Sequence, residues 1–392
     1  DLGRLTSSKQ PLDGLETRYE YSTMDQIVST TSPDEGTTRF KYRQDKKIRF
    51  SQNEEQALAN QFSYTNYDGL GRPVESGVIN NAGFDGSDPD QVSLPSGTTE
   101  EVSAIQYDEL DISELTLLIS TPQDPEHLNP TFLAGNVAKT SNDQVTTYYS
   151  YDVHGRLKWL IQKIEGLGVT NQANTKTIDY TYDDITGAVK LVDYQKNSTT
   201  QRFVHRYTYD PINYSLIRVE TSTDGVNFIE HATYDYYETG ALKRTDLAGG
   251  LQGIDYVYNL SGQLKAINHP DLTSTSDPGG DSDDFFGMTI DYNSDDYKRS
   301  NAFSPLANVN VNRDRFDGNI KGVTWKTKRG SNPVTSQYSY EYNRNNWLTQ
   351  ADFSSSSNSN ATDYQVRGIR YDANGNIDKL IRNKNTVSGS SN

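Results

Sequence analysis

The chain contains no cysteine among its 392 residues. This excludes disulfide bonds, thiolate nucleophiles and cysteine-ligated metal sites. Apolar residues are also scarce, since only 33% of the chain is hydrophobic and its mean hydropathy is −0.80. No apolar run approaches the ~20 residues that a membrane-spanning helix needs. We therefore expect neither a large apolar core nor insertion into a membrane.

Positive charge is in deficit, with a net charge of −16 and an isoelectric point near 4.8. Proteins bind nucleic acid through basic surfaces, so this balance argues against a nucleic-acid partner. Aromatic residues, by contrast, make up 11% of the chain, with 27 Tyr against 12 Phe. Disordered chains are poor in aromatic residues, so we expect this chain to fold. Tyrosine suits a β surface that is half exposed to water.

One short motif recurs along the chain. It consists of Tyr, then Asp or Asn, a turn glycine and commonly Arg and Leu. The clearest copies comprise Tyr67, Asp68, Gly71 and Arg72; Tyr151, Asp152, Gly155, Arg156 and Leu157; Tyr182, Asp183 and Gly187; Tyr258, Gly262 and Leu264; and Tyr371, Asp372 and Gly375. Copies in the middle of the chain begin about 22 to 27 residues apart, a spacing typical of repeat arrays.

Each part of the motif has a role in a β-hairpin. Alternation before the acid, as in Tyr180-Thr181-Tyr182, predicts a strand. The Asp side chain can accept a backbone N–H at the start of a turn, and the glycine supplies a positive φ. The Leu after the turn is expected to pack across the hairpin on the Tyr, a pair worth roughly 0.2 to 1 kcal/mol. Since a single hairpin is marginal, many hairpins must join edge to edge.

The predicted array covers residues 1–382, and residues 383–392 are expected to be a disordered tail. Loop-rich interruptions are expected at about 77–147 and 269–287, with Tyr107-Asp108 as a decayed copy inside the first. Residues 53–61 fit a short helix and a loop equally well.

The Tyr-Asp-x-x-Gly-Arg-Leu copies resemble the YD repeats of the RHS (rearrangement hotspot) family and its teneurin relatives. Residues 316–325, 338–348 and 371–377 are similar to RHS-repeat cell-surface proteins of gliding Gram-negative bacteria. The resemblance implies an all-β fold, in which antiparallel hairpins join into a continuous spiralling β-strip that is part of a hollow shell. Such shells enclose a C-terminal toxin or act as adhesive scaffolds. The chain shows no self-cleavage core of the Asp-Pro-x-Gly-Leu type, so we expect it to supply part of a shell wall.

The function expected from this resemblance is structural. The chain would be a non-enzymatic segment of a secreted or cell-surface shell protein, outside the outer membrane of a bacterium, serving as scaffold, adhesin or cargo-enclosing wall. The alternative is a carbohydrate- or protein-binding module on the shell surface or interior. Expected partners are other segments of the same shell, an export-machinery or surface protein, and glycans. No cofactor is expected, and no nucleophile, metal triad or phosphate loop points to an enzyme.

Four aspartates in the second interruption are candidates for a calcium site: Asp277, Asp281, Asp283 and Asp284. Calcium takes six to eight oxygen ligands, which acidic glycine-rich loops can supply. Their spacing does not match an EF-hand, so a solvated acidic loop is the favoured interpretation.

Other chemistry-bearing side chains are interpreted as structural. The five histidines share no metal-ligand spacing: His127, His154, His205, His231 and His269. Arg72 and Arg156 are expected to pair with the Asp of a neighbouring repeat or to stack on its Tyr. Trp159, Trp325 and Trp347 could stack on sugar rings, but packing in the core is favoured because large aromatic side chains are mostly buried.

Overall fold

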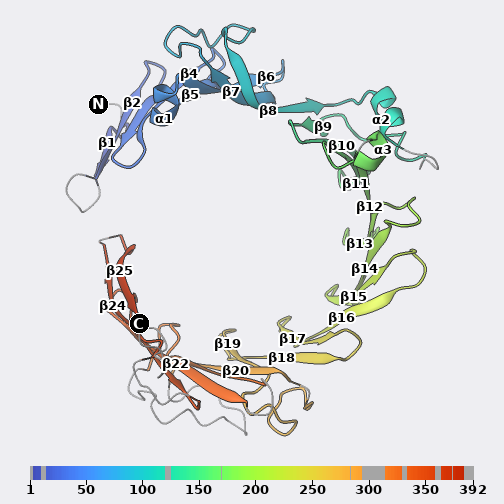
Figure 1. The fold of residues 1–392 in the computed structure, drawn as a ribbon, viewed down its shortest axis with the longest axis vertical. Coiled ribbons are helices and arrows are strands. Elements are labelled where there is room, and N and C mark those ends of the chain that lie inside the picture. The colour runs from blue at the N-terminus through green and yellow to red at the C-terminus, as the bar shows by residue number, and fades with distance from the viewer. Residues whose placement is uncertain are drawn as a thin grey trace, which may run out of the picture. The chain divides into compact units, whose positions relative to one another are not determined.

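The structure is a computed structural model that describes residues 3–9, 15–119, 125–168, 170–282, 284–293, 314–328, 333–357, 363–372 and 374–383. Within these residues the chain forms 25 strands and three short helices, and all the strands belong to one antiparallel sheet (Figure 1). The predicted all-β fold of joined antiparallel hairpins is confirmed. The predicted disordered tail lies outside the described residues, apart from Asn383.

The chain divides into two compact units, of which the first holds residues 1–204 and 223–227 and the second holds residues 205–222 and 228–392. The strand β14 (Phe203–Tyr209) contains the boundary between them. The elements of the first unit are β1 (Ser7–Lys9), β2 (Glu16–Tyr21), β3 (Ile27–Ser32), β4 (Gly36–Tyr42), β5 (Ile48–Gln52), α1 (Glu54–Leu58), β6 (Gln61–Tyr67), β7 (Pro73–Asn80), β8 (Thr98–Tyr107), α2 (Ile112–Leu118), β9 (Val137–Ser141), β10 (Val145–Tyr151), β11 (Leu157–Ile164), α3 (Asn171–Asn174), β12 (Thr175–Tyr182) and β13 (Val189–Tyr194). The second unit contains β15 (Leu216–Ser222), β16 (Ile229–Tyr236), β17 (Leu242–Leu247), β18 (Gln252–Tyr258), β19 (Leu264–Ile267), β20 (Phe286–Asp291), β21 (Gly322–Thr327), β22 (Val334–Tyr342), β23 (Leu348–Ser355), β24 (Val366–Tyr371) and β25 (Ile377–Arg382).

Strands pair with their neighbours along the chain. In the first unit β1 to β13 pair one after another, always antiparallel. In the second unit β15 to β25 do the same. Each hairpin therefore covers the open edge of the hairpin before it, which a single hairpin cannot do for itself.

A register shift marks the start of each motif turn. In the pair β10–β11, Ser150 lies opposite Trp159 but Tyr151 lies opposite Leu157, so the second strand holds one extra residue. Equivalent shifts occur at Tyr21, Tyr42, Tyr67, Tyr107, Tyr182, Tyr236, Tyr258, Tyr342 and Tyr371. The motif thus encodes a β-bulge that places the motif Tyr opposite the residue that follows the turn.

The motif tyrosine also joins each hairpin to the hairpin before it. The Tyr182 hydroxyl donates a hydrogen bond of 2.7 Å to the carbonyl oxygen of Leu157, the residue that follows the preceding turn. Eight further tyrosines of the described residues make the equivalent bond at 2.7–3.2 Å: Tyr21 to Leu5, Tyr42 to Ile27, Tyr67 to Ile48, Tyr151 to Val137, Tyr236 to Leu216, Tyr292 to Leu264, Tyr342 to Ile320 and Tyr371 to Leu348. Burial raises the pKa of Tyr182, so its hydroxyl remains a proton donor at neutral pH.

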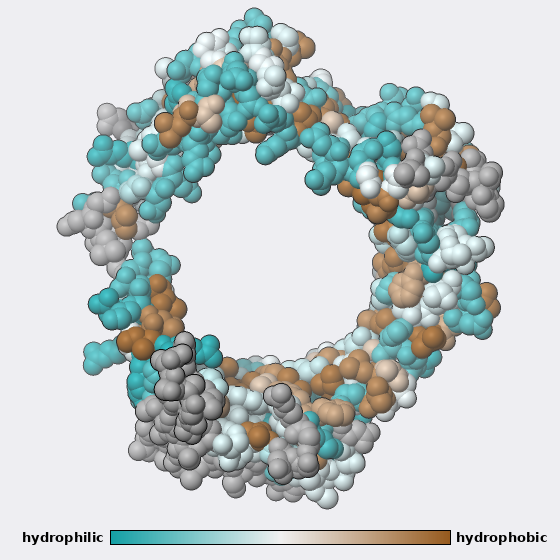
Figure 2. Space-filling view, viewed as in Figure 1, coloured by the Kyte–Doolittle hydropathy of each residue, from teal (hydrophilic) through white to brown (hydrophobic). Residues whose placement is uncertain are grey.

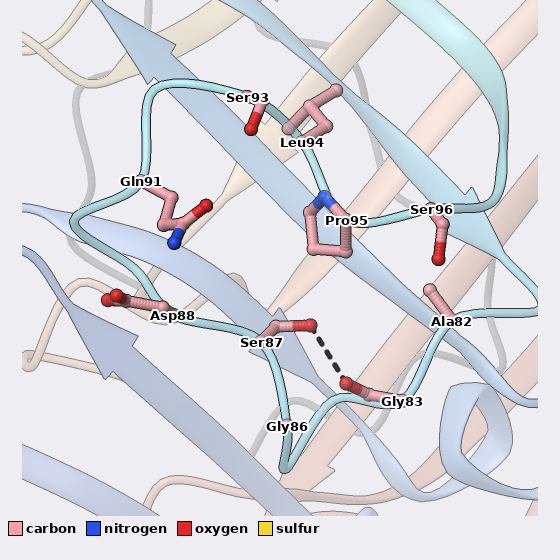
Figure 3. Close-up of a pocket in the computed structure, with 10 residues that line it drawn as sticks. All are labelled: Ala82, Gly83, Gly86, Ser87, Asp88, Gln91, Ser93, Leu94, Pro95 and Ser96. Carbon is pink, nitrogen blue, oxygen red and sulfur yellow. Dashed lines mark hydrogen bonds between the residues drawn. The ribbon is translucent and has the colours of Figure 1, made fainter.

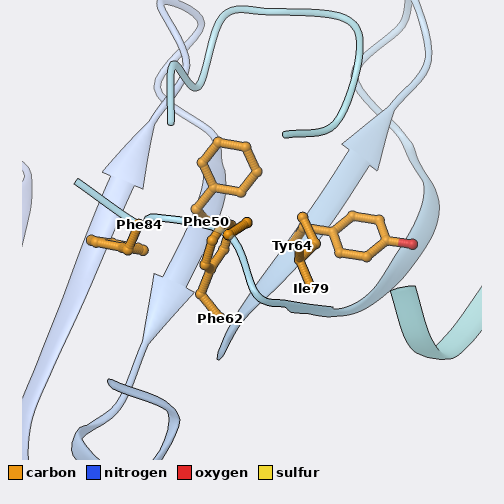
Figure 4. Packing of buried hydrophobic residues seen from close by; sticks show 6 residues of the cluster. Phe50, Phe62, Tyr64, Ile79 and Phe84 are labelled. Atoms are coloured by element: carbon orange, nitrogen blue, oxygen red, sulfur yellow. The ribbon is translucent and has the colours of Figure 1, made fainter. Parts of the chain in front are cut away.

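Insertions between strands cover one face of the sheet and form small cores with it. Phe50 lies opposite Tyr64, and Phe62 lies opposite Ile79, so all four side chains share one face. The insertion after β7 brings Phe84 onto this face, where its ring centroid lies 5.6 Å from that of Phe62 (Figure 4). The interval 77–147, which the sequence predicts to be rich in loops, contains the strands β8 and β9. Its first insertion contributes Phe84 to this core.

The second core is covered by a helix. Leu115 and Leu118 of α2 pack on Tyr148, Trp159 and Ile161, which lie on one face of β10 and β11. In Figure 1, α2 and α3 lie side by side next to these strands. The sequence did not predict either helix.

Of the two alternatives for residues 53–61, the structure shows the helix. Asn53 caps α1, because its side chain accepts the Gln56 N–H while the Gln56 side chain accepts the Asn53 N–H. None of the helices in the described residues combines the length and the apolar character that a membrane-spanning helix needs.

The hydrogen bond between hairpins can be tested at Tyr182. We expect Tyr182→Phe to lower the free energy of unfolding by about 1 kcal/mol, because the Leu157 carbonyl loses its donor while the ring remains. Tyr214→Phe is the control, since that side chain is 54% exposed, and it should change stability by less than about 0.5 kcal/mol. Urea denaturation of both variants measures the difference. Equal effects of the two substitutions would contradict the role of the hydroxyl.

Candidate functional site

In the clean copies of the motif the acid holds the turn. Asp152 Oδ1 accepts the backbone N–H groups of His154 and Arg156, both at 2.9 Å. Gly155 takes a φ of 76°, which favours glycine. Asp68, Asp183, Asn259, Asn343 and Asp372 accept backbone N–H groups of their turns in the same way. Backbone hydrogen bonds from Thr186 lower the pKa of Asp183 to about 2. These carboxylates are therefore ionised turn acceptors.

Arg72 connects two repeats. Its Nε donates to Asp68 Oδ2 of its own turn at 2.7 Å, and its Nη2 donates to Asp108 Oδ2 of the next repeat at 2.5 Å. The guanidinium also lies 4.2 Å from the ring centroid of Tyr107. The hydrogen bonds from the Arg72 side chain lower the pKa of Asp108 to about 2. Tyr107 and Asp108 therefore act as a repeat. Asp108 also accepts the N–H of Gly135, which lies 27 positions later in the chain.

Arg156 occupies the same position two repeats later. It donates to Asp152 Oδ2 at 2.6 Å and lies 4.4 Å from the ring centroid of Tyr182. Trp347 takes this position on Tyr371, with ring centroids 5.0 Å apart. The last residue of the turn, Arg156 or Trp347, therefore covers the tyrosine of the following hairpin.

A different group of polar side chains gathers on β17 and β18. Arg244 lies opposite Asp255 and Asp246 lies opposite Gly253, so these four residues share one face of the sheet. Arg244 donates to Asp246 Oδ1 at 2.9 Å and to Asp255 Oδ2 at 2.5 Å. The strand register alone thus builds a charged centre on the face that an insertion covers.

The insertion between β19 and β20 adds three of the predicted calcium candidates to this centre. Asp281 Oδ2 accepts from Arg244 at 2.7 Å. Asp277 is only 6% exposed and Asp284 is 0% exposed. The favoured interpretation of a solvated acidic loop is therefore wrong for these two residues, because the insertion folds back onto the sheet. Asp283 lies outside the described residues.

We call Asp246, Asp255, Asp277, Asp281 and Asp284 the acidic cluster. Three of these carboxylates, those of Asp246, Asp255 and Asp281, pair with the Arg244 guanidinium. The five carboxylates and this guanidinium together carry a formal charge of −4 when all are ionised. Burial raises the pKa of Asp255 to about 6, against the lowering effect of Arg244. Burial and the neighbouring Asp277 carboxylate raise the pKa of Asp284. Negative charge in the cluster is thus not fully compensated by the protein.

Neutral groups position the cluster. Asp284 Oδ1 accepts from Gln252 Nε2 at 3.0 Å and from Asn268 Nδ2 at 2.7 Å. Asn268 Oδ1 in turn accepts the backbone N–H of Asp255 at 2.7 Å, so one amide side chain connects β18 to the insertion. Asp277 Oδ2 accepts the N–H groups of Gly279 and Gly280 at 2.7 and 2.8 Å.

Close backbone approach makes the cluster dense. A Cβ on Gly279 would lie 1.9 Å from Arg244 Nη1 and 2.3 Å from Asp255 Oδ2. A Cβ on Gly253 would lie 2.1 Å from Arg244 Nη2. A side chain at either position would therefore displace the Arg244 guanidinium from its partners.

Sequence reasoning missed Arg244, Asp255 and Asn268. A signal was available in the strand pattern. Asp255 lies two residues before the apolar Val257, so both side chains point to the same, buried face of the strand. Such a charge on a covered face calls for a partner.

The histidines and tryptophans form no catalytic constellation among the described residues. His127 is 1% exposed and pairs with Asp179 Oδ1 at 2.8 Å, next to Trp159, which is fully buried as the core interpretation predicts. His154 is exposed in its turn. Trp325 and Trp347 are only partly buried.

A pocket of about 390 Å³ lies within the insertion after β7 (Figure 3). Its wall contains the carboxylate of Asp88, the amide of Gln91 and serine hydroxyls, and Ser87 Oγ donates to the Gly83 carbonyl oxygen across it at 2.8 Å. This lining has no base next to a nucleophile.

Comparison with protein families identifies RHS repeats in the chain. Residues 1–38 match the family model described as RHS Repeat. This match confirms the family resemblance that the motif predicts. A search of curated proteins finds no match.

Solved structures share the fold. The crystal structure of TcdB2-TccC3 without its hypervariable C-terminal region matches with a TM-score of 0.52 and 13% identity, covering 93% of this chain and 17% of that chain. The crystal structure of TcdB2-TccC3 matches with a TM-score of 0.48 and 12% identity, covering 95% of this chain and 20% of that chain. The Photorhabdus luminescens Tc holotoxin pore with the TccC3-D651A mutation matches with a TM-score of 0.47 and 12% identity, covering 95% of this chain and 19% of that chain. The chain thus spans about a fifth of these proteins or less, and the likeness is one of fold.

The structural role of Arg244 can be tested by substitution. We expect Arg244→Gln to lower the free energy of unfolding by about 3 kcal/mol, because the buried Asp255 loses its ion-pair partner. Arg218→Gln on β15 is the control, since the paired side chains of Arg218 and Glu230 are 49% and 36% exposed, and it should cost less than about 0.5 kcal/mol. Urea denaturation compares the two. A loss as small as that of the control would show that the guanidinium does not hold the cluster.

Proposed function

We propose that this chain, which carries RHS repeats, is a non-enzymatic wall segment of a larger secreted shell protein. The observation that supports this proposal is the use of the motif side chains. The Tyr182 hydroxyl binds the preceding hairpin, and the Arg156 guanidinium covers the Tyr182 ring from that hairpin. Asp152 is a turn acceptor that also holds Arg156. The polar side chains of the repeat thus hold the turn and join neighbouring hairpins.

An exposed strand edge supports a continuing wall. All six residues of β25 are exposed, and this strand pairs with β24 on one side. It presents apolar side chains to solvent, with Ile377 57%, Leu380 48% and Ile381 47% exposed. Figure 2 shows hydrophobic side chains in this part of the molecule. Within the described residues no strand pairs with the other edge of β25, and an open apolar edge favours the addition of another strand. We propose that another segment of the same shell supplies this strand.

The proposed role of the wall is to scaffold or enclose cargo outside the cell. The absence of cysteine and the net charge of −16 are compatible with an extracellular polymer of hairpins that needs no redox chemistry. Scaffold, adhesin and cargo wall share this architecture. They differ in what binds to the wall.

A binding module is the second candidate, and one observation favours it. Trp325, Tyr338, Tyr340 and Phe353 form an aromatic row on one face of β21 to β23. The Trp325 and Tyr338 rings are stacked with centroids 5.9 Å apart, and the Tyr338 and Tyr340 rings with centroids 6.0 Å apart. These side chains are only partly buried, so their outer faces could accept sugar rings.

Hydrogen exchange tests the wall proposal. In the full-length protein we expect the backbone amides of β25 to exchange much more slowly than in the isolated chain, because a neighbouring strand pairs with them. The strand β22 is the control, since it is paired on both sides within the chain and should be protected in both forms. Equal exchange of β25 in the two forms would contradict a continuing wall.

A glycan array separates the wall from the binding module. The wall proposal predicts no saturable glycan binding by this chain. Binding that disappears in Trp325→Ala and persists in Trp347→Ala would instead assign the aromatic row as a sugar site, since Trp347 packs on Tyr371 outside the row.

A further inference from the structure

Three buried carboxylate oxygens in the acidic cluster have no donor among the described residues, and a wall role does not need them. Asp284 is 0% exposed and Asp277 is 6% exposed. No donor of the described residues reaches Asp284 Oδ2 or Asp277 Oδ1, and the same holds for Asp281 Oδ1. A buried ionised carboxylate is unfavourable unless a donor or a cation pairs with it. The Asp277 carboxylate lies close enough to Asp284 to raise the pKa of Asp284.

The spacing of the carboxylates fits a single ion. One oxygen each from Asp255, Asp277 and Asp281 lies within 4.8 Å of the others. Calcium holds oxygen ligands at 2.3–2.6 Å, so two of its ligands lie up to about 5 Å apart. The three oxygens therefore lie within the distance that the ligands of one calcium ion span.

Arg244 does not compensate the charge of Asp277 and Asp284. Its guanidinium pairs with Asp246, Asp255 and Asp281 Oδ2. It donates to neither Asp277 nor Asp284 among the bonds of the described chain, and one positive charge faces five carboxylates. A divalent cation would remove two of the four remaining negative charges.

We propose that Asp255, Asp277, Asp281 and Asp284 bind a calcium ion that fastens the insertion between β19 and β20 to β17 and β18. The donor set consists of oxygens alone, which suits a hard cation. The ligands come from a strand and from an irregular insertion, so the site can supply the flexible geometry that calcium accepts. Magnesium requires a near-ideal octahedron at shorter distances and is disfavoured.

The proposal differs from the simplest alternative, in which Asp277 and Asp284 share one proton. A shared proton would satisfy the pair without any metal, and calcium would then add nothing to the stability of the protein. Calcium binding and calcium-dependent stability therefore separate the two explanations.

The experiment uses the full chain after treatment with EGTA. Calorimetric titration with calcium chloride should show one site with a Kd between about 10⁻⁶ and 10⁻³ M. Thermal unfolding should shift to higher temperature in millimolar calcium, because the ion binds the folded state. Asp284→Asn should weaken calcium binding at least about tenfold. In EGTA this variant should melt no lower than the wild type, since the substitution removes an uncompensated buried charge.

Asp277→Asn provides a second variant, because its amide oxygen can still accept the N–H groups of Gly279 and Gly280. Asp184→Asn is the control, since Asp184 is an exposed acid in the turn after β12, away from the strands of the cluster, and it should bind calcium as the wild type does. The proposal is overturned if the wild type gives no calcium heat and no thermal shift, if magnesium binds in place of calcium, or if the two cluster variants respond as Asp184→Asn does.

Discussion

The hydrogen bond from the motif tyrosine to the carbonyl of the preceding hairpin is the contact on which the rest of the structure depends. A strand edge pairs through its backbone, and such pairing alone leaves the register free to slip. The tyrosine hydroxyl fixes the register, because it reaches only the carbonyl of the residue after the turn, as Tyr182 reaches Leu157. The bulge in the second strand of the hairpin sets Tyr151 opposite Leu157, whose carbonyl oxygen accepts the hydrogen bond from Tyr182 of the next hairpin. The motif tyrosine thus pairs with a residue of its own hairpin and also donates a hydrogen bond to the preceding hairpin.

This arrangement explains how a chain with so few apolar residues folds. The stacking of Arg156 on Tyr182, and of Trp347 on Tyr371, buries aromatic surface between hairpins without a central core. Apolar packing is concentrated where insertions cover the sheet, as at Phe62 and Trp159. Each such core is small and local. The low hydropathy of the chain reflects a sheet stabilised repeat by repeat.

The acidic cluster arises from the same architecture. The antiparallel register sets Arg244 opposite Asp255, and an insertion that covers this face brings Asp277 and Asp284 out of water. Elsewhere the insertions deliver phenylalanine or leucine to the sheet, whereas here the insertion delivers carboxylates. The insertions thus cover the sheet in the same way but differ in the side chains that they place on it. A covered sheet face accepts polar side chains if an ion or a set of donors compensates their charge.

The sequence alone determined the all-β fold, the hairpin as the repeating unit and the residues of the turn, because these follow from alternation over two residues and from short-range hydrogen bonds such as those of Asp152. It also predicted that Arg72 would contact a neighbouring repeat, since the repeat spacing places equivalent residues side by side. It did not reveal α2, whose leucines are stabilised by Trp159 on another segment, nor the burial of Asp277 and Asp284. Only the tertiary structure decided these features, because they depend on which sheet face an insertion covers. That choice is made by contacts between residues far apart in the chain, such as Asn268 with Asp284 and Arg244 with Asp281, and no local pattern encodes them.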